Sequence, residues 1–447
     1  MKITQLIAFL PWLFTQIPAY SSGPWSMQSC VRHALEHRHD LKIQTWNIKS
    51  QKTNLTEAYT AFLPSLSAGS GLSYSFGRSV DPGTNTYSTV SNLNNNYSAS
   101  LSLPLFKGGI LVHQLKISRL QLALGKSQLE AQKDQTALNV MNAFTEAVYY
   151  DMMTEYADEK LEESRLQMQK TRRMAELGMK SQSDVALIEA QLAQDEYDHT
   201  HSLYLKEKAL LTLKELMNYP AESALVLLRP QMQTADTDTV SSPDIAEETI
   251  QSFRWSEAHN PGMKQSRLNI QQKLYYRRQA LGYFFPSISF SAGISTSYFR
   301  TLGESGYDSF RQQARNNLGE YISFNVSMPI FNRLGNAMNY RRKKIEYYIA
   351  EENHAQQQTT LWTDIRQTIL ERESLRKECV RMQKKVEADS IAYMVVAHKF
   401  DEGLAAPLDL KTAAASLLSS RATLLQCRLN FILRQRLAAY YQGQPLY

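Results

Sequence analysis

Four stretches of the chain alternate regularly between apolar and small polar residues. In the first stretch, Leu66 and Phe76 fall on one face, while Ser67 falls on the other. A period of two predicts β-strands. None of the stretches contains a charged residue, although 21% of the whole chain is charged. The predicted strands are 65–77, 95–106, 286–299 and 321–332.

The absence of charge on both faces favours a membrane environment for these strands. A soluble sheet normally carries charged residues on its wet face, whereas a charge that faces lipid costs about 2–4 kcal/mol at the midplane. The Ser, Gly and Asn of the second face suit a polar lumen, and aromatic residues such as Phe62 and Phe106 bracket the strands. The alternative is a Ser-rich soluble sandwich. The polar segments 78–94 and 300–317 are expected to be exposed loops.

Long helices account for most of the remaining sequence. Residues 110–177 contain no proline and a single glycine, and residues 336–402 contain neither. In each half a second helix then returns, over 183–218 and over 408–441. Apolar residues recur at helical spacing on a narrow stripe, which is typical of coiled-coil partners. Each half is therefore expected to contain a long helical hairpin.

The chain contains an internal duplication. Phe-Leu-Pro-Ser-Leu at 62–66 returns as Phe-Phe-Pro-Ser-Ile at 284–288, and Pro-Leu-Phe at 104–106 returns as Pro-Ile-Phe at 329–331. The order is kept and the offset between the copies is nearly constant, which indicates two copies of a domain-sized half. We expect a signal peptide at 1–21, a first repeat at 22–220, a linker at 221–250 and a second repeat at 251–447.

The hairpin tips obey the same offset. Gly178 returns as Gly403 and Asp184 returns as Asp409, with the spacing between glycine and aspartate unchanged. A glycine directly after a helix is a common C-cap, because it adopts the left-handed conformation without strain. The tips are predicted at 178–182 and 403–407.

Composition and the N-terminus narrow the class of protein. The 447 residues include only 18 Gly and 14 Pro, and a net charge of +6 gives no case for nucleic-acid binding. Residues 1–21 read as a secretory signal, with an ordinary apolar segment as the alternative. Three cysteines are too few for a disulfide framework. Cys30 could suggest a lipid anchor, but the residues before it make a poor lipidation motif.

Four strands cannot close a barrel, and open sheet edges are not tolerated in lipid. Barrels begin at about eight strands, so at least two chains must contribute strands. Three chains would supply twelve.

The ordered motifs resemble the TolC-type outer-membrane efflux proteins over essentially the whole mature chain. The resemblance rests on the aromatic, Cys, Ala-Leu and Asp-Leu-Lys sequence of 25–42, on the duplicated strand motifs and on the Gly and Asp of the tips. It implies a mainly helical homotrimer with a 12-stranded outer-membrane β-barrel and a periplasmic helical coiled-coil barrel. It also implies a periplasmic adaptor (membrane fusion) protein as partner. An inner-membrane transporter, either a proton-driven antiporter or an ATP-driven exporter, would complete the system.

The resemblance also implies a periplasmic gate. The family often carries two acidic residues one turn apart after the tip glycine of the second half; Asp409 matches the first position, while Thr412 occupies the second. A gate with one carboxylate per chain would hold less negative charge. The alternative role for Asp409 is a charge at a helix N-terminus. The tip residues Gly178, Asp184 and Gly403 are the expected sites of adaptor docking.

No catalytic constellation accompanies these features. The sequence contains no nucleophile elbow, P-loop or dinucleotide fingerprint. His33 and His37 lie one turn apart and could bind a metal, but a wet helix with several histidines is the simpler interpretation. We expect no enzyme, no cofactor and no metal. The expected function is a passive export channel of the outer membrane, in contact with its lipid, that serves tripartite efflux or type I secretion. The alternative is a non-conducting coiled-coil structural protein of the envelope.

Overall fold

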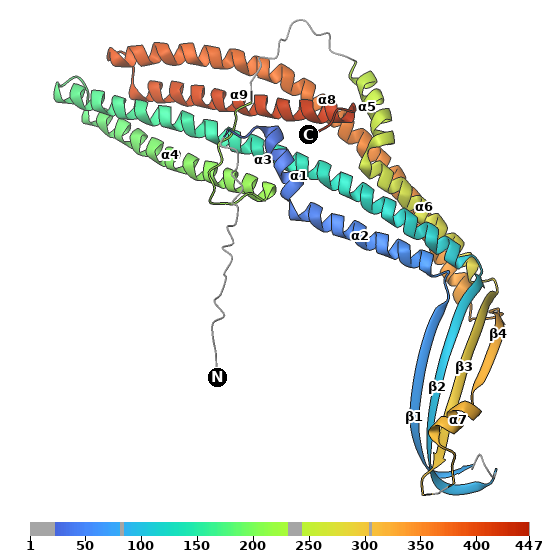
Figure 1. The fold of residues 1–447 in the computed structure, drawn as a ribbon. Helices are drawn as coiled ribbons and strands as arrows, with labels where there is room; N and C mark the ends of the chain where they lie inside the picture. Colours follow the sequence, from blue (N-terminus) through green and yellow to red (C-terminus); the bar gives the residue numbers. More distant parts are fainter. Residues whose placement is uncertain (1–22, 81–84, 231–243, 304–305, 447) are drawn as a thin grey trace, which may run out of the picture.

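The computed structural model describes residues 23–80, 85–230, 244–303 and 306–446, so the expected signal peptide lies outside the described residues. The molecule is elongated, with a sheet at one end and the tips of two long helical hairpins at the other (Figure 1). Along the chain, α1-α2-β1-β2-α3-α4 is followed by α5-α6-β3-α7-β4-α8-α9. Apart from α7, the second half repeats the order of elements in the first.

The four strands form one antiparallel sheet in the order β1-β2-β3-β4. The strands are β1 Ser65–Val80, β2 Tyr87–Lys107, β3 Ser287–Thr301 and β4 Gly319–Ser327. Because β2 pairs with β3, the two halves meet at the centre of the sheet. Among the described residues, β1 and β4 each pair on one side only and leave an open edge.

The sheet differs from the sequence expectation in three places. Most of the described part of the expected loop 78–94 is strand: β1 continues to Val80 and β2 begins at Tyr87, because backbone pairing such as Arg78 with Thr89 needs no apolar side chain. β4 ends at Ser327 rather than at 332. Pro329 follows closely and has no N–H to donate to a ladder.

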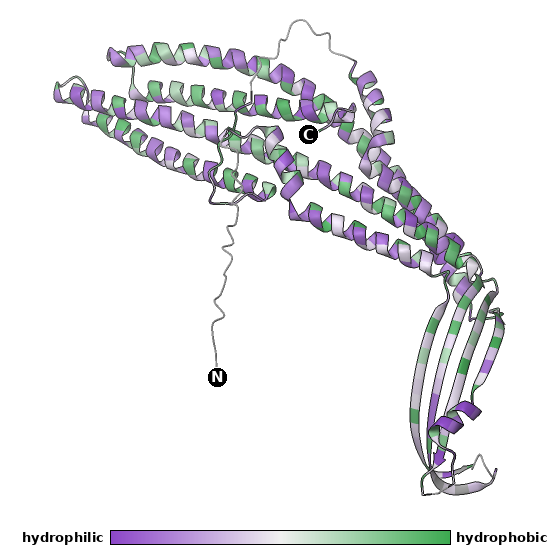
Figure 2. Cartoon of the chain, viewed as in Figure 1, coloured by the Kyte–Doolittle hydropathy of each residue, from purple (hydrophilic) through white to green (hydrophobic). Residues whose placement is uncertain are grey.

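The third difference lies in the expected loop 300–317. It contains the helix α7 Phe310–Asn316, which rests against β3 through a hydrogen bond from the Thr296 hydroxyl to the Ala314 carbonyl. Figure 2 shows this helix as largely hydrophilic beside strands that are mostly pale, with green and purple bands.

The long hairpins agree closely with the predicted helices. The first hairpin is α3 Ile110–Glu176 and α4 Gln182–Met217; the second is α8 Gly335–Asp401 and α9 Pro407–Tyr441. Both α3 and α8 contain 67 residues, and at 1.5 Å per residue each is about 100 Å long. None of the described helices is long and apolar enough to cross a membrane.

The helices next to the sheet lie in the same order as the strands. Besides α7 and the two hairpins, the described chain contains four shorter helices: α1 Met27–His37, α2 His39–Thr60, α5 Ile245–His259 and α6 Pro261–Gly282. Next to the sheet, α2 contacts α3, α3 contacts α6, and α6 contacts α8. The helices α2, α3, α6 and α8 adjoin β1, β2, β3 and β4 in the chain, so the helical layer keeps the strand order (Figure 1).

A close glycine crossing joins the sheet to the helical layer. Gly108 and Gly109 alone separate β2 from α3, and both have positive φ, at 54° and 77°. A Cβ atom added at Gly108 would lie 2.1 Å from the carbonyl oxygen of Gly282 at the end of α6. Only glycine allows the two halves to approach so closely here.

The main apolar core lies midway along the helices, where α1 packs against α3 and α4. The stripe predicted along α3 is buried there: Ala137, Val140 and Phe144 are at most 1% exposed. Leu213 and Met217 of α4 are fully buried against the same cluster. Elsewhere the hairpins alternate between apolar and polar residues along their length (Figure 2), as a narrow packing stripe requires.

Candidate functional site

The two hairpin tips have the same turn geometry. Gly178 has φ 74° and Gly403 has φ 77°, and nothing lies within 4 Å of a Cβ atom placed on either. The turns close with hydrogen bonds from Met179 N–H to the Met174 carbonyl (2.8 Å) and from Leu404 N–H to the Lys399 carbonyl (2.7 Å). The positive φ, and not crowding, therefore explains the glycines.

Asp184 and Asp409 cap the returning helices. The Asp184 carboxylate accepts hydrogen bonds from Ser181 N–H (3.0 Å) and the Ser181 hydroxyl (2.9 Å). The bond from this backbone N–H is the main reason that the pKa of Asp184 is lowered. The Asp409 carboxylate accepts a hydrogen bond from Ala406 N–H (3.2 Å). Asp409 thus occupies the helix-capping role that was its alternative.

Asp409 and Thr412 are both exposed on the first turns of α9. The Thr412 hydroxyl donates to the Leu408 carbonyl of its own helix at 2.8 Å. Within the described part of the chain, the hydrogen bonds of both side chains stay within the start of α9 and its cap. Both side chains therefore remain accessible to solvent at the tip of the second hairpin.

The tips of the two hairpins contact one another. Lys170 on α3 forms an ion pair with Asp401 on α8 at 2.9 Å. Lys180 lies over the Phe400 ring, 4.8 Å from its centre. Beneath these contacts a small core contains Met168, Ile188, Phe400 and Leu410. Sequence reasoning missed the Lys170–Asp401 pair, because the partners are 231 residues apart and no local pattern connects them.

A buried carboxylate on α4 links the two helices of the first hairpin through contacts with α3. Asp195 is 1% exposed, lies 2.6 Å from the Lys160 ammonium and accepts a hydrogen bond from Ser164. Beside this group, burial raises the pKa of Glu163, and the negative charge of Asp195 raises it further.

The second hairpin contains an equivalent pair of lysine and carboxylate, but its carboxylate lies on the outgoing helix α8 and not on the returning helix α9. Lys385, which occupies the position of Lys160 in the second repeat, lies 2.5 Å from Asp389 of α8. The pKa of Asp389 is lowered, first by its hydrogen bond to Lys385 and further by those to Ser420 and Ser416. Lys160 and Lys385 are separated by the repeat offset, so the duplicated sequence itself contains a signal for this group.

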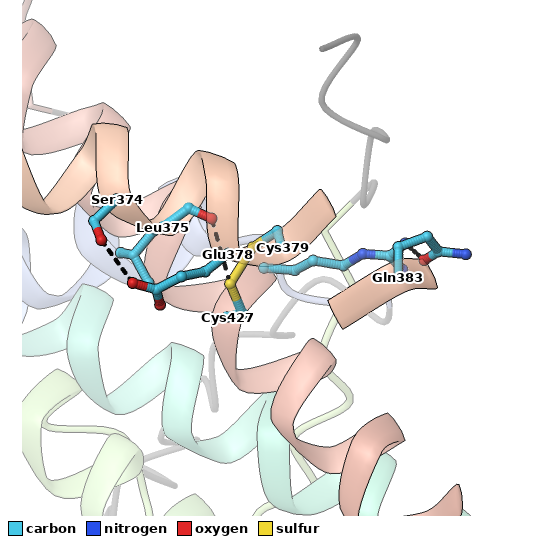
Figure 3. The surroundings of a disulfide bond; sticks show 7 residues. Ser374, Leu375, Glu378, Cys379, Gln383 and Cys427 are labelled. Atoms are coloured by element: carbon cyan, nitrogen blue, oxygen red, sulfur yellow. Dashed lines mark hydrogen bonds between the residues drawn. A yellow bond between two sulfur atoms is a disulfide. The ribbon is translucent and has the colours of Figure 1, made fainter. Parts of the chain in front are cut away.

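A disulfide bond connects Cys379 of α8 to Cys427 of α9 (Figure 3). Three cysteines are too few for a disulfide framework, but two of them form this single bridge between antiparallel helices, which the sequence pattern does not predict. The equivalent positions of the first hairpin are Thr154 and Ser202, where the Thr154 hydroxyl donates to the Ser202 carbonyl at 3.3 Å. Both hairpins are therefore joined at the same level, one covalently.

Of the N-terminal histidines, His33 is buried in the core, whereas His37 is only half-buried on the same helix. His33 is 8% exposed, its ring stacks on His37 at 4.1 Å, and its Nδ1 lies 3.2 Å from the Met217 carbonyl. Burial, followed by the positive charge that His37 can carry, lowers the pKa of His33. The described residues contain no cluster of three or more His, Cys, Asp or Glu side chains that could hold a metal. Cys30 is fully buried within α1, and burial raises the pKa of its thiol to about 12.

One face of the sheet exposes large apolar side chains. Leu66 is 77% exposed on β1, and Ile322 and Phe324 on β4 are 74% and 68% exposed. Such a continuous apolar surface marks a region that is covered by lipid or by another protein. Together with the open edges of β1 and β4, it makes the sheet the second candidate site.

Comparisons with known proteins agree on one family and one fold. A family profile described as outer membrane efflux protein matches residues 30–219 and 255–439. No curated protein matches the chain. Crystal structures of CusC, concerned with folding and transmembrane channel formation, are similar at 16% identity and a TM-score of 0.76, with 96% of each chain covered.

Two further solved structures share the fold. The outer membrane channel CmeC of Campylobacter jejuni has 17% identity and a TM-score of 0.75, covering 94% of this chain and 87% of its own. The outer membrane protein VceC of Vibrio cholerae has 14% identity and a TM-score of 0.75, covering 94% and 97%. At these identities the likeness concerns the fold, which is the mainly helical, duplicated fold predicted from the sequence.

Proposed function

The chain belongs to the outer membrane efflux protein family, and on that premise we propose that it is a passive, gated channel of a tripartite efflux or type I secretion system. The family supports the coarser role of an outer membrane efflux channel. The assembly, the gate and the partners are part of the proposal.

The open sheet, whose central stretches carry no charge, is the strongest support for the proposal. β1 and β4 each present an unpaired edge, and unsatisfied backbone groups are not tolerated in lipid. Edge-to-edge closure of three chains gives a barrel of twelve strands, the homotrimer. The exposed apolar face, with Leu66 and Ile322, then meets lipid, and the Ser and Gly face lines the lumen. Since each strand leads into one helix, the lumen continues between the helices.

The hairpin tips are the proposed gate. Lys170–Asp401 and the Phe400 contacts hold the two hairpins of one chain together, so opening requires that they separate. Six similar hairpins from three chains would close the tunnel with approximate sixfold symmetry. Asp409 and Thr412 are the proposed lumen-facing gate residues. Gly178, Asp184 and Gly403 are the proposed contact points of a periplasmic adaptor.

The partners and the cargo follow from this architecture. An adaptor protein would connect the tips to an inner-membrane transporter, either a proton-driven antiporter or an ATP-driven exporter, and the transporter would select the cargo. A passive channel needs neither a catalytic set nor a cofactor. We keep 1–21 as signal peptide, 22–220 and 251–447 as repeats and 221–250 as linker within this proposal.

Conductance in planar lipid bilayers tests the proposal with the purified full-length protein. We expect single channels, and we expect Asp409→Ala to raise the conductance or to change its dependence on divalent cations. Unchanged conductance in that variant would reject Asp409 as a gate residue while leaving the channel intact. A protein that gives no channels and is released from membranes by alkaline carbonate would be a peripheral structural protein.

A further inference from the structure

Positive charge is concentrated in the helices next to the sheet. Seventeen Lys and Arg residues and a single acid, Glu57, fall in four stretches that flank the strands, which we call the basic collar. Since the whole chain carries +6, the rest of the chain carries a net charge of −10. The collar comprises residues 41–64, 107–129, 260–286 and 328–345.

The basic collar begins where the uncharged stretches 65–77, 95–106, 286–299 and 321–332 end. Lys107 is the last residue of β2, and Lys116 lies two turns into α3. Arg278 precedes β3 by nine residues, and Lys344 lies in the third turn of α8 after β4. At 1.5 Å per residue, these side chains fall within about 15 Å of the sheet. The polar headgroup layer on each side of a bilayer is about 5–8 Å deep, and the long side chains of Lys and Arg can extend toward it.

Most charges of the collar have no acidic partner in the described chain. Only Lys273 and Lys343 form ion pairs, and both pair with Glu346. Lys116, Arg278 and Lys344 form none, and all three are exposed. In the distal hairpins, by contrast, exposed cations are commonly paired, as Arg165 is with Glu162 and Arg173 with Glu176. Concentrated like charge without compensation is unfavourable unless an anion is supplied from outside.

Aromatic rings are interleaved with these cations. Tyr275 of α6 lies under both the Lys116 ammonium, at 5.2 Å, and the Arg278 guanidinium, at 5.4 Å. Lys344 lies 5.7 Å from the Tyr348 ring. Tyr and Trp prefer membrane–water interfaces because one end of the ring is apolar and the other polar. Basic residues beside them can extend along the apolar surface and place their charge among headgroups.

We propose that the basic collar is a binding surface for anionic phospholipid headgroups in the leaflet on the helical side of the sheet. This inference rests on the proposed membrane location of the strands. The phosphate groups of acidic lipids would supply the missing negative charge, and each Lys or Arg near such a surface strengthens binding by about fivefold. Three substitutions are therefore expected to weaken the preference for acidic lipid, and to weaken it less as salt rises.

The test compares two triple variants of the full-length protein in vesicles of phosphatidylcholine and phosphatidylglycerol. The collar variant is Lys116→Gln, Arg278→Gln and Lys344→Gln, which removes one cation from each of three helices. The matched control is Lys208→Gln, Lys377→Gln and Lys384→Gln, three exposed lysines of the distal hairpins. Each protein is extracted with its surrounding lipid by a styrene–maleic acid copolymer, and the lipid is quantified by mass spectrometry.

For the native sequence we expect phosphatidylglycerol to be enriched about threefold over the bulk ratio. The collar variant should lose at least half of this enrichment, whereas the control should keep it. Equal loss in both variants, or none in the collar variant, rejects the proposal. A collar variant that keeps its lipid but changes the reversal potential in a KCl gradient also rejects it, because the charges would then face the lumen. A protein that forms channels without enriching acidic lipid rejects the lipid-binding proposal but not the proposed channel function. A protein that does not insert into the vesicles at all rejects the proposed channel function itself.

Discussion

Asp195 of α4 and Asp389 of α8 bind equivalent lysines at the same level of the two hairpins, but from opposite helices. In the first hairpin Lys160 and Ser164 stand on α3 and the carboxylate on α4; in the second, the carboxylate stands where Ser164 would be. Ser420 in turn occupies the position of Asp195 in the second repeat. The duplicated halves thus keep the interaction and exchange the helix that supplies its negative charge.

This exchange predicts a rescue within the first hairpin. Asp195→Ser should destabilise the protein by about 3 kcal/mol, because it leaves the Lys160 ammonium without its buried partner. Adding Ser164→Asp recreates the arrangement of the second hairpin and should recover at least half of the loss. Urea unfolding followed by circular dichroism measures both. A double variant no more stable than Asp195→Ser would contradict the equivalence of the two groups.

Glu163 should make the first hairpin less stable at neutral pH. Burial and Asp195 raise its pKa above that of the unfolded chain, so the folded state favours the protonated form. Stability is therefore highest below the ordinary pKa of Glu and is lost as pH rises through the raised value. Glu163→Gln should raise the unfolding free energy at pH 7 by less than about 1 kcal/mol, since solvent screens this half-exposed carboxyl. At pH 4 the gain should shrink. A gain that is the same at both pH values would assign the effect to packing.

The disulfide should stabilise the second hairpin against unfolding. Cys379 and Cys427 are 48 residues apart, and closing a loop of that length is worth about 4 kcal/mol in the chain-entropy relation. The double substitution Cys379→Thr and Cys427→Ser, which copies Thr154 and Ser202 of the first hairpin, should lose most of this stabilisation. The loss should be smaller than for two alanines, because the Thr hydroxyl can donate to the facing carbonyl. Reduction of the native protein with dithiothreitol serves as the control, and equal stability before and after reduction would contradict the prediction.

The Lys170–Asp401 pair should affect gating more than stability. Both side chains are about half exposed, and such a pair contributes at most about 1 kcal/mol. If the three chains of the proposed trimer open together, losing about 0.5 kcal/mol in each should make openings roughly tenfold more frequent. Lys170→Asp should show this in single-channel recordings.

The exchanged pair tests whether charge attraction is the cause. Lys170→Asp combined with Asp401→Lys should restore the native frequency of opening. A double variant that opens as often as the single variant would show that the effect comes from the tip structure and not from the pair.

The sequence predicted the helices well because their ends are determined locally. Gly178 and Gly403 end α3 and α8 with a positive φ, which nearby residues reveal without tertiary information. The start of β2 at Tyr87 was missed because its outer part is rich in Asn and Ser, and only pairing with β1 makes it a strand. Lys170 and Asp401 come together only when two hairpins pack, and no pattern within either hairpin records that contact. The burial of His33 likewise depends on Tyr219 and Trp25, which other segments supply.

The close contact between Gly108 and Gly282 couples the orientation of the sheet tightly to the direction of α3. No flexible linker separates β2 from α3, so the sheet anchors one end of an arm about 100 Å long. A rotation of one degree at the crossing moves the far end by about 2 Å, close to the difference between a formed and a broken ion pair. A side chain introduced at Gly108 would therefore shift the hairpin tip at the opposite end of the protein, although it makes no contact there.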